Sequence, residues 1–415
     1  MKKLIICLSI LLGAIAPVIA QENKPDEPAN EGIRFHDNEP WAQILEMASQ
    51  QGKLIFIDCY TVWCGPCKGL SEDIFPKKEM GDFFNDRFIC AKYDMEKGDG
   101  AMLYAKYKPH ILGFPTMLFI DKDGNVVQQL AGYQEAESII KAAEKAADGR
   151  DLFTQQKLYA EGRRDLPFLR DYMESLDAAC LSDDLNKLAA DYIASIEPSR
   201  LEEDEIWAMF GKYVKDVDSP AFEYLVKNAA RFQHKYGRDR AAINTQIGNA
   251  CGNQLRDILK INFNEDGTAQ PLSTDTARAE HLISLMQRVG LSDVTTNKAK
   301  LYILKNLLNG HNDKAWATVK LFHEIGDFPF YAVAVSDYID YLLPLTKDKK
   351  TLKDYLQVLN ASLAKERKPD DSFACFKTLA KLYGRLGDKT RAAEYQKKYD
   401  DAYAKFMEQW SAYFK

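Results

Sequence analysis

Two cysteines stand three residues apart in the stretch Tyr60-Thr61-Val62-Trp63-Cys64-Gly65-Pro66-Cys67-Lys68. A run of strand-forming residues, Leu54-Ile55-Phe56-Ile57-Asp58, comes directly before this stretch. If a helix begins at Cys64, its free backbone N–H groups and the positive end of its dipole favour a thiolate there. Disulfide exchange requires a thiol of low pKa with a second thiol within reach. The stretch therefore predicts redox chemistry at these two residues.

The length and composition indicate a soluble protein of more than one domain. A chain of 415 residues is long for a single hydrophobic core, so two or three domains are expected. With 46% hydrophobic and 28% charged residues, the composition is that of ordinary globular proteins. The net charge of −6 includes no basic excess, which argues against a nucleic-acid partner.

Residues 1–20 have the pattern of a signal peptide. Lys2 and Lys3 precede an apolar segment, and Val18-Ile19-Ala20 provides a cleavage site before Gln21. The alternative is an uncleaved membrane anchor, but the apolar stretch is shorter than the roughly 20 residues that a membrane-spanning helix needs. We therefore expect an exported protein, periplasmic in a bacterium and soluble after cleavage.

The remaining cysteines do not form the dense, even pattern of a disulfide scaffold. Cys59 and Cys90 lie in strands that should be neighbours, but side-chain alternation puts them on opposite faces of a sheet. We expect both to be buried free thiols. The other isolated cysteines fall in helical patterns and are also expected to be buried: Cys180, Cys251 and Cys375.

The pattern of apolar residues divides the chain after the signal peptide into three parts. Residues 21–32 are polar and contain two prolines, so they predict a linker. Residues 33–149 alternate helices with strands, which predicts an α/β domain with a mixed sheet. The expected strands are 54–58, 88–93, 116–120 and 126–130, and the expected helices lie at 41–52, 64–76, 80–85, 100–107 and 135–147.

Residues 150–415 predict an all-α domain of helical repeats. Amphipathic helices separated by glycine and proline dominate, with hardly any strand signal. The last pair, 372–406, has small and aromatic residues where a tetratricopeptide-like hairpin requires them: Leu379, Tyr383, Gly387, Ala392, Ala393 and Tyr395. An irregular α-solenoid is expected, and no site is assigned in it.

Residues 33–149 resemble the thioredoxin family. The segment Trp63-Cys64-Gly65-Pro66-Cys67-Lys68 matches the active-site motif of that family residue for residue. Asp58 and Lys92 occupy the positions of a buried carboxylate and its lysine partner. Gly113-Phe114-Pro115-Thr116 matches the segment that carries a cis-proline, and Gly132 matches a glycine of the last strand. The resemblance implies the thioredoxin fold, a mixed central sheet flanked by helices.

The resemblance also implies catalytic roles. Cys64, exposed at the start of the helix, would attack a substrate disulfide, and the more buried Cys67 would resolve the mixed disulfide by forming the redox-active pair Cys64–Cys67. Asp58 would have a raised pKa and would carry the proton of Cys67. Pro115, if cis, would leave the backbone of Phe114 free to pair with an extended substrate.

Other residues of the motif would contact the substrate or support the site. Those expected to contact the substrate are Trp63, Gly65, Pro66, Phe114 and Thr116, and Lys92 is expected to support Asp58. Phe114 departs from the family, which usually has an aliphatic residue there, and so does Tyr60, where a tryptophan is common. These departures concern substrate preference and leave the exchange chemistry unchanged.

Two other interpretations of the cysteine pair compete with redox activity. One is a structural metal site, but a tetrahedral zinc site needs four ligands and no second pair of cysteine or histidine ligands lies nearby in the sequence. The other is a domain that keeps the fold without activity, against which the intact Cys64, Cys67, Asp58 and Pro115 argue. No metal and no cofactor is expected.

The sequence thus predicts an exported thiol–disulfide oxidoreductase that reduces disulfides in protein substrates, with electrons from a membrane thiol donor. One alternative is a binding module, in which the helical region binds a protein partner and the thioredoxin-like domain serves as a platform or a redox switch. A further alternative is a disulfide isomerase or oxidant.

Overall fold

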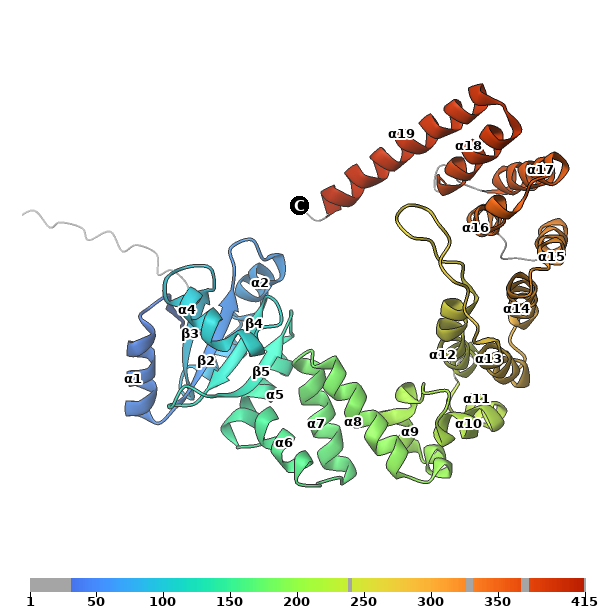
Figure 1. Ribbon diagram of the computed structural model, residues 1–415. Coiled ribbons are helices and arrows are strands. Elements are labelled where there is room, and N and C mark those ends of the chain that lie inside the picture. The colour runs from blue at the N-terminus through green and yellow to red at the C-terminus, as the bar shows by residue number, and fades with distance from the viewer. Residues whose placement is uncertain (1–30, 238–240, 326–330, 367–372, 414–415) are drawn as a thin grey trace, which may run out of the picture. The chain divides into compact units, whose positions relative to one another are not determined.

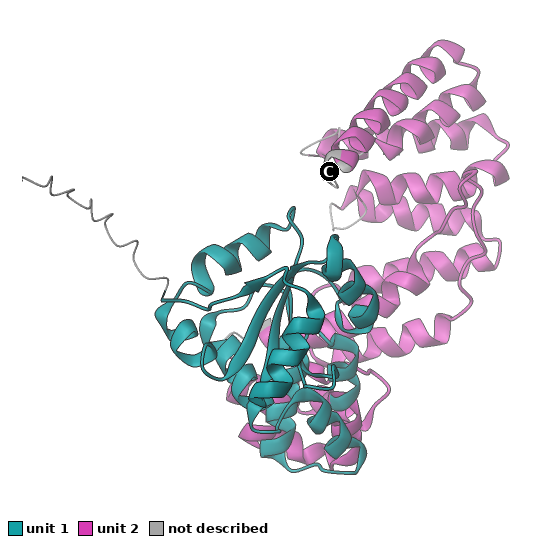
Figure 2. Cartoon of the chain, turned by 90° about the vertical axis from the view of Figure 1, so that its left-hand side faces the viewer, with its two compact units in different colours: residues 1–188 teal, residues 189–415 magenta. Residues whose placement is uncertain are grey.

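The computed structural model describes residues 31–237, 241–325, 331–366 and 373–413. The expected signal peptide and most of the expected linker lie outside the described residues. The chain divides into two compact units, residues 1–188 and 189–415 (Figure 2).

The first unit contains a five-stranded mixed sheet in the order β1-β3-β2-β4-β5 (Figure 1). Its strands are β1 (His36–Asp37), β2 (Leu54–Tyr60), β3 (Phe88–Asp94), β4 (Thr116–Ile120) and β5 (Val126–Ala131). β1, β3 and β2 are parallel, whereas β4 and β5 run antiparallel to their neighbours. The expected mixed sheet is confirmed, with the two-residue β1 as an addition that no sequence pattern indicated.

Helices cover both faces of this sheet and bury two hydrophobic cores. The helices are α1 (Trp41–Gln51), α2 (Gly65–Gly69), α3 (Lys78–Phe84), α4 (Gly98–Tyr107) and α5 (Ala136–Ala147), with a π-helical turn η1 (Leu70–Ile74) directly after α2 and a 3₁₀ turn η2 (Lys108–His110) after α4. Phe56 faces the core formed with η1, α3 and α5, and Ile57 faces the core formed with α1 and α4. This opposite placement follows from the alternation of side chains along β2.

The same alternation separates Cys59 from Cys90. Cys90 belongs to the core that contains Phe56, and Cys59 belongs to the core that contains Ile57. Both are free and buried. The expectation of two buried thiols without a disulfide between them is confirmed.

The start of α4 depends on a glycine at a close backbone approach. A Cβ atom on Gly100 would lie 2.0 Å from the carbonyl oxygen of Asp94 at the end of β3. We therefore expect Gly100→Ala to lower the free energy of unfolding by about 2–3 kcal/mol, although alanine normally stabilises a helix by about 0.5–1 kcal/mol relative to glycine.

The measurement for Gly100→Ala is the urea dependence of alkylation at the buried thiols Cys59 and Cys90, which reports the unfolding of this domain alone. Met102→Ala is a suitable control because Met102 lies in the same helix and is exposed. The control should change stability by less than about 0.5 kcal/mol. A gain in stability for Gly100→Ala would contradict the close packing.

Two further helices belong to the first unit. α6 (Leu152–Ala160) and α7 (Leu166–Ala178) pack against β5. Lys145 of α5 forms a buried ion pair with Asp171 of α7, with 2.7 Å between Nζ and Oδ1. The compact unit therefore continues past residue 149, while the expected domain boundary at 149/150 stays a prediction.

The rest of the described chain is helical, as expected. An isolated bridge between Phe263 and Ala269 is the sole β pairing among the described residues after β5. From α12 onward, each helix packs mainly on those next to it in the chain, as in a solenoid. The helices are α8 (Ser182–Ser195), α9 (Asp204–Phe210), α10 (Pro220–Lys227), α11 (Ala229–Tyr236), α12 (Ala241–Leu259), α13 (Thr276–Arg288), α14 (Val294–Leu308), α15 (Asn312–Glu324), α16 (Ala332–Leu342), α17 (Lys349–Lys365), α18 (Ala374–Leu386) and α19 (Lys389–Tyr413).

The last helical pair has the packing of a helical hairpin. α18 and α19 lie against each other, and the ring of Tyr383 stacks on that of Tyr395 with 5.4 Å between centroids. Among the described residues, no helix is both long enough and apolar enough to cross a membrane.

Candidate active site

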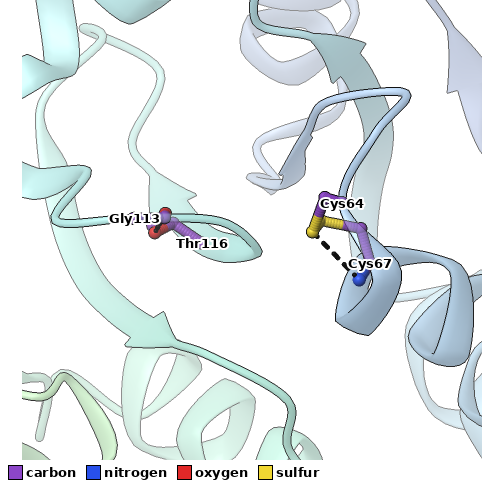
Figure 3. Close-up of a disulfide and its surroundings, with 4 residues drawn as sticks. All are labelled: Cys64, Cys67, Gly113 and Thr116. Carbon is purple, nitrogen blue, oxygen red and sulfur yellow. Dashed lines mark hydrogen bonds between the residues drawn. A yellow bond between two sulfur atoms is a disulfide. The ribbon is translucent and has the colours of Figure 1, made fainter. Parts of the chain in front are cut away.

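Cys64 and Cys67 lie at the beginning of α2 and form a disulfide (Figure 3). Their sulfur atoms are 1.96 Å apart and their Cα atoms 5.3 Å apart. Cys64 is the N-cap of the helix, and the backbone N–H of Cys67 donates to its Sγ at 3.1 Å. Pro66 lies in the first turn, where its missing N–H removes no helical hydrogen bond. The helix start therefore places a hydrogen-bond donor on the sulfur of Cys64.

Cys64 was expected to be more exposed than Cys67, but the two cysteines are equally buried. Each is 3% exposed, so the prediction of an exposed Cys64 is wrong for the disulfide form. The backbone N–H of Cys64 donates to the carbonyl oxygen of Thr61 at 3.2 Å, and this turn draws Cys64 inward. Val62 and Trp63 remain outside, 53% and 65% exposed.

The predicted proline loop is the second part of the site. The Phe114–Pro115 peptide bond is cis, and the hydroxyl of Thr116 donates to the carbonyl oxygen of Gly113 at 2.7 Å (Figure 3). Pro115 is buried, and its carbonyl oxygen accepts from the N–H of Gly132 at 2.8 Å. Because Thr116 pairs with Cys59 in the sheet, this loop lies beside the end of β2 that leads into the cysteine motif.

Aromatic contacts join the proline loop to the cysteine motif. The rings of Trp63 and Phe114 meet edge to face with 6.1 Å between centroids, and Phe114 also contacts Tyr104 of α4 at 6.0 Å. The indole N–H of Trp63 donates to Glu96 Oε1 at 3.1 Å. Sequence reasoning missed Tyr104 and Glu96, because no motif connects either residue with the cysteine pair. Trp63 and Phe114 thus lie together beside the disulfide.

Asp58 is the buried carboxylate of the domain. It lies on the sheet face that η1 covers, because Phe56, two residues earlier in β2, packs against Leu70 and Ile74. Asp58 is 1% exposed, and neither carboxylate oxygen has a hydrogen-bond partner among the described residues. Burial raises the pKa of Asp58 to about 7, an effect that the positive charge of Lys92 partly offsets.

Lys92 is placed beside Asp58 but pairs elsewhere. The two residues are partners in the register of β2 and β3. The Nζ of Lys92 nevertheless forms an ion pair with Asp37 of β1 at 3.1 Å. Lys92 therefore acts on Asp58 through its charge at a distance, and the carboxyl group stays without a direct partner in the described part of the chain.

The cysteines outside the pair fall into two groups. Cys251 and Cys375 are buried, as expected, whereas the expectation that Cys180 is buried is wrong. Cys180 lies in the turn after α7 and has a positive φ of 55°, which turns it out of the helix face. No group of three or more potential ligands that could hold a metal ion occurs within the described ranges.

Comparison with known proteins identifies the domain that carries this site. The model of the family described as "Thioredoxin-like domain" matches residues 41–147. This match identifies residues 41–147 as a thioredoxin-like domain.

Curated relatives are similar to about a quarter of this chain. A protein disulfide-isomerase from Hordeum vulgare is 28% identical over 104 residues, which is 25% of this chain and 20% of the relative. A thiol:disulfide interchange protein DsbD from Pseudoalteromonas atlantica is 26% identical over 120 residues, or 28% of this chain and 20% of the relative. The chain thus spans about a fifth of the length of these curated relatives.

One solved structure is similar over nearly all of its own length. The solution structure of a candidate disulphide-isomerase from Bacteroides thetaiotaomicron is 40% identical and covers 28% of this chain and 93% of that protein, with a TM-score of 0.25. The two curated relatives above are named as a protein disulfide-isomerase and a thiol:disulfide interchange protein.

Proposed function

We propose that this protein is an exported thiol–disulfide oxidoreductase that reduces disulfides in protein substrates through Cys64 and Cys67. The observation that carries the proposal is the Cys64–Cys67 disulfide at the start of α2, joined to the cis-proline loop through Trp63 and Phe114. The names of the relatives, which refer to disulfide isomerisation and interchange, support the same class of chemistry.

The reaction uses the two sulfur atoms in sequence. In the reduced protein, the thiolate of Cys64 attacks one sulfur of the substrate disulfide, a mixed disulfide forms, and the other substrate sulfur leaves as a thiolate. The thiolate of Cys67 then attacks the sulfur of Cys64 and releases the second substrate thiol. The substrate gains two electrons and two protons, and the Cys64–Cys67 pair is oxidised to a disulfide.

Local structure supports this order of attack. The N–H of Cys67 that donates to Cys64 Sγ would stabilise a thiolate on Cys64. Cys67 lies inside the first helical turn, with its sulfur at bonding distance from that of Cys64. Asp58, with a pKa raised to about 7, is suited to accept the proton of Cys67 before the second step.

Reduction of further substrates requires that the disulfide be reduced again. A reductant in an oxidising compartment must receive two electrons from a partner protein, and we propose a membrane thiol donor for this role. The substrate would contact the surface around Trp63, Gly65, Pro66, Phe114 and Thr116. No part of this exchange requires a cofactor.

The experiment that tests the direction of the reaction is the reduction potential of the Cys64–Cys67 pair in the full chain without residues 1–20. Equilibration with dithiothreitol, followed by alkylation and mass spectrometry, gives this value. We expect about −270 to −230 mV, the range of reducing thioredoxin-type proteins. A value near −120 mV, typical of strong protein oxidants, would contradict the reductase.

The second candidate function is disulfide isomerisation, which the name of the Hordeum vulgare relative favours. An isomerase reactivates ribonuclease with scrambled disulfides while its own pair stays reduced. Reactivation by this protein without a continuous supply of electrons would favour the isomerase over the reductase.

A further inference from the structure

The helical unit contains a groove with a volume of about 780 Å³. Helix α12 forms one wall, and the start of α14 and one face of α16 complete it. The lining residues of the first wall run from Asn244 to Ile261, which corresponds to about 25 Å at the helical rise of 1.5 Å per residue. A groove of this length and volume fits an extended ligand better than a compact one.

Side-chain amides are spaced along the α12 wall of the groove in a way that suits a peptide main chain. Asn249 and Asn253 lie one turn apart on α12 and are exposed. Asn249 has no hydrogen-bond partner among the described residues, and Asn253 has one long contact, 3.4 Å from its Oδ1 to Arg256. Positions four apart on a helix are separated by about 6 Å, close to the roughly 6.6 Å that two residues of an extended chain span.

An asparagine amide can both donate to and accept from a peptide group. Two asparagines at this spacing can therefore form hydrogen bonds with the main chain of alternate residues in an extended peptide, without contacting its side chains. The donors and acceptors that α12 presents to the groove match a main chain and carry no preference for sequence.

Charged groups of both signs enter the groove without partners. Lys300 of α14 and Asp337 of α16 are both partly buried, and neither forms a hydrogen bond or ion pair with any described residue. Burial lowers the pKa of Lys300 and raises the pKa of Asp337 to about 7. Polar groups removed from water without partners cost free energy, which a ligand with groups of both signs would recover. Arg256, Lys260 and Asp293 also line the groove, so a purely anionic or purely cationic polymer would meet several like charges.

A glycine in the wall leaves room that the chain itself does not use. Gly252 lies inside α12 and lines the groove, and a Cβ atom built on it would meet no atom within 4 Å. Glycine destabilises a helix interior relative to alanine, so the packing of this chain gives no reason for it. The missing side chain does allow another backbone to come close, between Asn249 and Asn253.

We propose that this groove binds an extended, unfolded segment of another polypeptide. Asn249 and Asn253 bind its main chain, Gly252 allows its close approach, and Lys300 and Asp337 pair with charged groups on it. This inference rests on the helical unit alone and goes beyond the thiol chemistry, because a segment without any cysteine would bind as well.

The test uses a probe that cannot react with Cys64. Fluorescently labelled, reduced and carboxymethylated lactalbumin is unfolded and has neither thiols nor disulfides. Its binding to the full chain without residues 1–20 is measured by fluorescence anisotropy. We expect saturable binding that Gly252→Ala weakens at least fivefold, and that Asn249→Ala combined with Asn253→Ala weakens at least tenfold.

Matched variants separate a lost ligand contact from a damaged fold. Gly384 in α18 is also a helical glycine whose Cβ would meet nothing, and it lies outside the groove. Gly384→Ala should leave the affinity unchanged, as should Gln396→Ala, an exposed amide on α19. The melting temperature of Gly252→Ala should equal or exceed that of the unaltered protein.

The proposal is overturned if the unaltered protein shows no saturable binding, or if Gly252→Ala binds the probe as Gly384→Ala does. A lower melting temperature for Gly252→Ala would also overturn it, because the space at this position would then belong to the fold. None of these outcomes depends on the redox activity of the thioredoxin-like domain.

Discussion

Replacing Cys64 with serine is expected to reduce disulfide turnover to the rate seen without protein. A serine hydroxyl cannot form the mixed disulfide, and we expect Cys67, whose sulfur lies at bonding distance from that of Cys64, to act in the resolving step alone. Cys67→Ser is expected to give a different result. Cys64 can still attack, but no thiol resolves the product, so a covalent complex with the substrate accumulates.

Turnover of these variants is measured as the reduction of insulin with dithiothreitol as electron source. The trapped complex is measured separately, by intact-mass analysis after the reduced variant is freed of dithiothreitol and mixed with insulin. Cys180→Ser is the matched control because Cys180 is the exposed free cysteine of the same unit. We expect full turnover for Cys180→Ser. A covalent complex with Cys64→Ser and none with Cys67→Ser would mean that the two cysteines exchange roles.

The framework of the thioredoxin-like domain could be predicted from sequence because its signals are local. The apolar run at 54–58 and the turn at 121–125 specify β2 and the β4–β5 hairpin, and the observed strands agree within two residues. Alternation along β2 and β3 was sufficient to place Cys59 and Cys90 in different cores. The two residues of β1 are too few to leave any periodic pattern.

The features that sequence did not provide depend on contacts between distant segments. The burial of Cys64 follows from the turn at Thr61, and the bond from Trp63 to Glu96 joins residues that no pattern connects. The groove in the helical unit is formed by α12, α14 and α16. When each helix is considered alone, its polar residues predict only a face exposed to solvent. The same sequence pattern describes an exposed face and a binding surface, and packing decides between them.

Asp58→Asn is expected to stabilise the oxidised protein at pH 8 and to leave its stability unchanged at pH 4. The pKa of Asp58 is raised from its ordinary value of 3.8 to about 7 by burial. Between pH 3.8 and about pH 7, Asp58 holds a proton in the folded protein that it releases in the unfolded chain. The free energy of unfolding therefore falls as the pH rises from about 4 to about 7. Three pKa units correspond to about 4 kcal/mol, and since an asparagine amide in this site is also unsatisfied, we expect a gain of about 2–4 kcal/mol at pH 8.

The free energy of unfolding is best measured by urea-dependent modification of Cys59 and Cys90 with 4,4′-dithiodipyridine, which reacts with thiols at both pH values and follows the thioredoxin-like domain alone. Asp123→Asn, in the exposed hairpin turn, is the control and should change stability by less than about 0.5 kcal/mol at either pH. An equal gain at pH 4 and pH 8 would show that the charge of Asp58 is not its cause.

Turnover should change in the opposite direction, because Asp58→Asn removes the group that accepts the proton of Cys67, and a loss of about 10²-fold is expected. Higher stability combined with slower resolution of the mixed disulfide would identify Asp58 as a carboxylate kept at a cost to the fold for the sake of the reaction.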